Sequence, residues 1–65
     1  MAYSNEELCE ATRQIDSTLH KLRETVQTLR GKENPARYKS QITLAERRIR
    51  AFSIANELIE QALEE

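Results

Sequence analysis

Residues 42–63 read ITLAERRIRAFSIANELIEQAL, and this stretch decides the fold. On a helix, with about 100° between successive residues, its apolar side chains form two stripes. The first stripe alternates steps of three and four residues and consists of Ile42, Ala45, Ile49, Phe52, Asn56, Ile59 and Leu63. The second stripe lies about 120° around the helix and consists of Leu44, Ala51, Ile54, Ala55, Leu58 and Ala62. Together they cover over half of the circumference, whereas a helix hidden by one neighbour needs only about 100°. We therefore expect this helix to pack against at least two neighbours.

The segment before it carries one narrow apolar stripe. Its members repeat in steps of four and three and are Leu8, Thr12, Ile15, Leu19, Leu22, Val26 and Leu29. This heptad pattern predicts an α-helix that buries a single face. Ser4 and Glu7 have the spacing of a capping box, which places the start of that helix near residue 5.

A short turn separates the two helical segments. We expect Gly31 to end the first helix in the left-handed conformation, and Asn34 and Pro35 to cap and begin the second. A turn over residues 31–34 makes the two helices antiparallel neighbours. The sequence thus predicts an all-α fold, a two-helix antiparallel hairpin in a single domain spanning 1–65, with helices at about 5–30 and 35–64.

A chain of 65 residues has little core, and such chains rely on disulfides, metals or oligomerisation. With one cysteine, Cys9, and one histidine, His20, it can form neither an intrachain disulfide nor a closed zinc site made of these residue types. Oligomerisation is therefore the route to stability that we expect for this chain. We expect no metal, no cofactor and no catalytic residue, and interpret Cys9 as a half-buried filler beside the stripe of the first helix.

Charge favours association with a second copy. Residues 21–50 contain nine basic and three acidic side chains, a net of 9 − 3 = +6, and the remainder has one against eight, a net of 1 − 8 = −7. A hairpin collects these into a basic loop end and an acidic open end. Two hairpins with loops at opposite ends place basic on acidic twice. We predict an antiparallel homodimer, a four-helix bundle whose interface is the second stripe.

Two polar residues interrupt the stripes. Asn56 has two interpretations: a buried device that fixes helix register, or a solvated residue near the rim of the bundle. Asn56 lies only about two to three helical turns from residue 65, which favours the interpretation as a solvated residue near the rim. Thr12 is interpreted as a tolerated polar residue at a core position.

Three functional hypotheses follow. The preferred one is a small non-catalytic interaction protein, an adaptor or regulator, acting as a homodimer. The first alternative is a nucleic-acid-binding regulator that uses the basic loop end, where cations and an aromatic ring are interleaved. Its contact residues would be Arg30, Lys32, Arg37, Tyr38, Lys39 and Arg47. Tyr38 is also in phase with the first stripe and has an alternative role in closing the core. The second alternative is a helical subunit whose second stripe meets a different protein.

The sequence also bears on location. Its N-terminus has no apolar run typical of a signal peptide, and no stretch approaches the roughly 20 apolar residues of a membrane span. A single unpaired cysteine agrees with a reducing compartment. We expect a cytoplasmic protein without a membrane partner.

Overall fold

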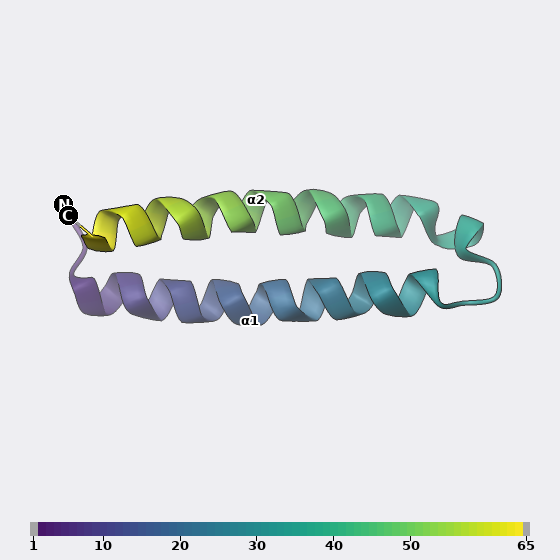
Figure 1. Ribbon diagram of the computed structural model, residues 1–65, viewed down its shortest axis with the longest axis horizontal. Helices are drawn as coiled ribbons and strands as arrows, with labels where there is room; N and C mark the ends of the chain where they lie inside the picture. The colour runs from purple at the N-terminus through teal and green to yellow at the C-terminus, as the bar shows by residue number, and fades with distance from the viewer. Residues whose placement is uncertain (1, 65) are drawn as a thin grey trace.

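The computed structural model describes residues 2–64 and is an antiparallel helical hairpin (Figure 1). Helix α1 spans Asn5–Arg30, a short 3-10 helix η1 spans Pro35–Tyr38, and helix α2 spans Lys39–Glu64. The two α-helices have 26 residues each and lie side by side along a rod of 47 × 15 × 15 Å. The start of α1 and the end of α2 lie at one end of the rod, and the turn lies at the other. The predicted two-helix hairpin is confirmed.

The predicted capping box begins α1. The Glu7 N–H donates to Ser4 Oγ at 3.1 Å, and the Ser4 N–H donates to Glu7 Oε1 at 3.0 Å. Two backbone donors that lack partners within the helix are satisfied in this way. The sequence therefore fixes this helix end locally, without help from α2.

The turn differs from the prediction at Gly31. Its φ of −81° and ψ of −5° are right-handed, so the predicted left-handed conformation is wrong. Its N–H continues the helical pattern by donating to the Gln27 carbonyl at 3.0 Å. Helix α1 still ends at Arg30, and Asn34, three residues beyond Gly31, lies outside the helical region with φ of −130° and ψ of 75°. Pro35 disfavours the helical conformation of the residue before it, which accounts for the backbone conformation of Asn34.

The start of the second helical segment also differs. Asn34 makes no side-chain capping hydrogen bond, although Pro35 occupies the predicted first position. The turn that Pro35 begins is 3-10, and the α-helix starts four residues later, at Lys39. Proline fixes φ but does not decide between the two helical hydrogen-bonding patterns.

One layer of side chains holds the helices together. Helix α1 buries Leu8, Leu19, Val26 and Leu29, whereas α2 buries Ala45 and Asn56. No large side chain in the described part of the chain is completely removed from solvent. The hairpin alone thus has a thin core, as expected for so short a chain.

Asn56 belongs to this layer. It is only 7% exposed, and its Nδ2 donates to Asp16 Oδ1 across the two helices at 2.6 Å. Our favoured interpretation, a solvated residue near the rim, is wrong because Asn56 is buried and its side chain is bonded to Asp16 of α1. The Asn56 Oδ1 and Thr12 Oγ1 atoms are buried without a hydrogen-bond partner.

Cys9 is also placed differently from the prediction. It is exposed, whereas the sequence indicated a half-buried position. Leu8 takes the buried position of this turn, and Cys9 follows it by about 100° around the helix, which points it away from α2.

Candidate interaction surface

The second stripe of α2 lies uncovered on the surface of the hairpin. Leu44, Ile54 and Leu58 are 48%, 44% and 59% exposed. Ala51 is exposed as well, and Ala55 and Ala62 are half-buried. The six predicted interface residues therefore lie along one helix, and its larger members remain about half in contact with water.

The geometry of the hairpin explains this exposure. A single neighbouring helix covers a stripe of about 100°, and α1 covers the first stripe of α2. The second stripe is centred about 120° away, so α1 reaches only its nearer edge. Ala55 and Ala62 on that edge are half-buried, and Ile54 and Leu58 on the far side are exposed.

The opposite side of the first stripe is charged. There Arg30 Nη2 donates to Glu46 Oε2 at 2.6 Å and links the two helices. Beside this pair a groove of about 500 Å³ has Val26 and Ile49 in its lining. Its polar lining residues are Arg23, Gln27, Arg30, Glu46, Arg50 and Ser53. The polar contacts between the helices thus lie on one side of the hairpin, and the second stripe runs along the other side of α2, with Arg47 beside it.

Burying the second stripe against a partner would contribute a favourable free energy to association. Complete burial of a Leu or Ile side chain is worth about 1.5–3 kcal/mol. Because Leu44, Ile54 and Leu58 are each about half exposed, roughly half of that value is left for each. The sum of a few kcal/mol is comparable to the stability of a small domain.

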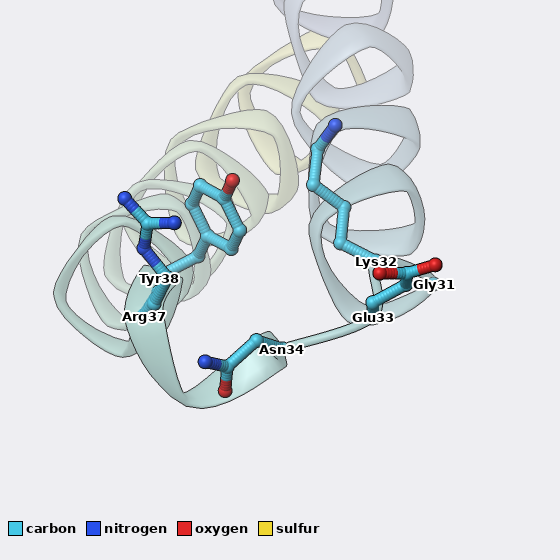
Figure 2. A pocket seen from close by; sticks show the side chains of 6 residues that line it. All are labelled: Gly31, Lys32, Glu33, Asn34, Arg37 and Tyr38. Atoms are coloured by element: carbon cyan, nitrogen blue, oxygen red, sulfur yellow. The ribbon is translucent and has the colours of Figure 1, made fainter.

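The loop end forms a second surface, shown in Figure 2. A hollow of about 450 Å³ is lined there by Gly31, Lys32, Glu33, Asn34, Arg37 and Tyr38. The Lys32 Nζ lies 5.9 Å from the centroid of the Tyr38 ring, within the range of a cation–π contact. Tyr38 is half-buried, in agreement with a part in closing the core.

The six residues predicted to contact an anion or nucleic acid do not share one surface. Lys32, Arg37 and Tyr38 line the loop hollow. Arg30 lies in the charged groove, paired with Glu46, and Arg47 lines a hollow on α2 with Ala51 and Ile54. Lys39 is exposed at the start of α2. The rotation of the two helices spreads these neighbours in sequence around the rod.

Sequence reasoning missed the polar contacts between the helices. Asp16 and Glu46 looked like surface residues, yet each holds a side chain of the other helix. Residues at equal distances from the middle of the 31–34 turn would place Asp16 opposite Ile49 rather than Asn56. The 3-10 turn shifts the register, and the sequence pattern held no clear signal for it.

Two further properties concern residues 2–64. Neither α1 nor α2 has the length and apolar character that a membrane crossing requires. Within the same residues, no three His, Cys, Asp or Glu side chains come together as a metal site.

Comparison with known proteins adds no relationship. No family model matches the chain, no curated protein matches it, and no solved structure matches it.

Proposed function

We propose that this chain is a non-catalytic helical interaction protein that acts as a homodimer, an adaptor or regulator in the cytoplasm. Two hairpins pack through the second stripe of α2 and form an antiparallel four-helix bundle. The outer helix faces of the bundle then contact other proteins.

One observation carries this proposal: the fold leaves the second apolar stripe of α2 open. Leu44, Ile54 and Leu58 lie on it among alanines, and polar contacts between the helices are made on the other side of the hairpin. Contiguous exposed apolar side chains of this kind are typical of interaction sites.

The distribution of charge supports a second copy as the partner. The loop end carries Lys32, Arg37 and Lys39, and the described residues at the open end include Glu6, Glu57 and Glu60. An antiparallel arrangement brings the loop end of each copy to the open end of the other. The attraction per exposed pair is small, but it has the same sign at both ends.

The test is the solution mass, measured by light scattering on a sizing column at low and moderate salt. The expected mass is twice 7.6 kDa, or 2 × 7.6 = 15.2 kDa. Ile54→Glu and Leu58→Glu are expected to give a monomer with lower helicity, because each would bury a charge in the interface.

Ser17→Glu is the matched control. Ser17 is exposed on the outer face of α1, and Arg13 and Lys21 stand four residues before and after it. The Ser17→Glu substitution adds the same negative charge at an exposed position between two basic residues, so this variant should keep the mass of a dimer. A monomeric wild-type chain, or a dimer in both stripe variants, would contradict the proposal.

A second candidate function is nucleic-acid binding at the loop end, favoured by the hollow that Lys32, Arg37 and Tyr38 line. This function predicts that the chain binds a labelled single-stranded oligonucleotide and that its affinity falls steeply as the salt concentration is raised. A Lys32→Ala, Arg37→Ala double variant should abolish that binding without altering the dimer mass. Unchanged binding by the double variant would remove this candidate.

A further inference from the structure

The centre of the second stripe is a mirror pattern about Ala51. Along one narrow band of α2, within about 40° on the helical wheel, the residues are Ser40, Leu44, Ala51, Leu58 and Ala62. Leu44 and Leu58 stand seven residues on either side of Ala51, and Ser40 and Ala62 stand eleven residues on either side. Read in either direction, the band is small, large, small, large, small.

Such a pattern fits an antiparallel pair of α2 helices related by a two-fold axis. In an interface with two-fold symmetry, residue i of one copy contacts residue j of the other, and j contacts i. For antiparallel α2 helices with the axis beside Ala51, Leu44 of one copy lies level with Leu58 of the other. Each small residue likewise lies level with a small residue, and Ala51 lies beside Ala51. The absence of a large side chain at the centre permits close approach of the two helices.

The charges of α2 change sign near the same point. Lys39, Arg47, Arg48 and Arg50 precede Ala51, and Glu57, Glu60 and Glu64 follow it. The exception, Glu46, is paired within the hairpin with Arg30. An antiparallel pair centred on Ala51 therefore brings the basic half of each α2 beside the acidic half of the other, whereas a parallel pair would bring like charges together.

From these two observations we infer that the two-fold axis of the homodimer passes beside Ala51, with Leu44 of each copy packed against Leu58 of its partner. The inference rests on the proposed homodimer and adds its partner geometry: α2 against α2, antiparallel, in one register. Ile54 of the other copy lies one residue, about 1.5 Å, from the level of Arg47, and the aliphatic stem of Arg47 covers it there.

This arrangement separates pairs of positions by very different distances. Helix axes about 8–10 Å apart bring two directly facing Ala51 Cα atoms to roughly 3.5–5.5 Å, which overlaps the range of about 4.4–6.8 Å that a disulfide spans. The two copies of Leu44 would lie 14 residues apart along the helix, about 21 Å at 1.5 Å per residue. The two copies of Leu58 would be equally far apart. Leu44 and Leu58 of different copies would be adjacent.

The experiment is disulfide cross-linking in a Cys9→Ser background, which removes the exposed native thiol. Ala51→Cys, Leu44→Cys and Leu58→Cys are oxidised separately, and the last two are also mixed in equal amounts. Each reaction is repeated in urea, where contacts between unfolded chains are unspecific. The solution mass of each variant is measured before oxidation.

The expected result is a covalent dimer from Ala51→Cys alone and from the mixture, with no native cross-linking above the urea level from Leu44→Cys or Leu58→Cys alone. Efficient self-cross-linking of Leu44→Cys would show a parallel pair and overturn the inference. An Ala51→Cys variant that is dimeric but does not cross-link would also overturn the inference. Either of these two results would leave the proposed homodimer intact. A monomeric mass for every variant and for the Cys9→Ser parent would overturn the homodimer, and the inference with it.

Discussion

Helices α1 and α2 have the same length and pack against each other, but they bury different kinds of side chains in the interface between them. Helix α1 buries four large aliphatic side chains in it, Leu8, Leu19, Val26 and Leu29. The large apolar members of the first stripe of α2 are all only half-buried, and three of its other aliphatic residues, Leu44, Ile54 and Leu58, are exposed. Packing within the hairpin therefore buries the apolar stripe of α1, whereas part of the apolar surface of α2 stays exposed.

The difference follows from the widths of the apolar surfaces. A narrow stripe fits one neighbour, whereas two stripes about 120° apart need two. The structure thus separates a helix that serves the fold from a helix that serves both the fold and, as we propose, association. Four changes would test or refine this comparison, from the largest expected effect to the smallest.

The first change compares Leu19→Ala with Leu58→Ala. Leu19 is 5% exposed and lies in the hairpin contact, so its truncation should lower the free energy of unfolding by about 2–5 kcal/mol. Leu58 is 59% exposed, so its truncation should cost less, chiefly through dimerisation. Urea unfolding followed by circular dichroism at several protein concentrations measures both. The Leu58→Ala loss should depend on protein concentration. Equal losses at every concentration would end the distinction between the helices.

The second change replaces the polar residue in the contact. Asn56→Leu removes a buried Oδ1 that has no partner and leaves Asp16, which is exposed, to be solvated. We expect the free energy of unfolding to rise by about 1 kcal/mol. Thermal unfolding of the variant beside Asp16→Asn, which keeps a hydrogen-bonding group opposite Asn56, provides the measurement. A lower melting temperature for Asn56→Leu would show that the Asp16–Asn56 bond outweighs the unpaired oxygen.

The third change concerns the turn that joins the helices. Gly31 has right-handed dihedral angles, and an added Cβ would lie 3.4 Å from the Gln27 carbonyl oxygen. Gly31→Ala should therefore stabilise the hairpin by a few tenths of a kcal/mol, mainly by restricting the unfolded chain. The melting temperature, compared with that of a Gly31→Asn variant, tests this. A marked loss in the alanine variant would mean that the turn requires a left-handed glycine after all.

The fourth change is salt, which acts on the ends of the rod and not on the stripe. Raising it to about 1 M should weaken the proposed dimer only modestly, since screening removes the attraction between basic and acidic ends. The dissociation constant at low and high salt, from analytical ultracentrifugation, measures the effect. Stronger association at high salt would assign the dimer to apolar burial alone.

Much of the fold follows from local patterns. The apolar spacing of residues 8–29 places one face of α1 in the contact, and Ser4 with Glu7 sets where that helix begins, because a cap depends only on residues a turn apart. The two stripes of α2 likewise follow from spacing alone, and the structure leaves the second one open at Leu44, Ile54 and Leu58. A stripe is a property of one helix and is readable without its neighbour.

Only the tertiary structure decided how the two helices align. The 3-10 turn Pro35–Tyr38 sets their register, and that register brings Asn56 to Asp16 and Glu46 to Arg30. A one-dimensional pattern gives the face of each residue but not its height relative to the other helix. The residues opposite Asn56 are about 40 positions away in the sequence, so its burial depended on a contact that no local spacing encodes.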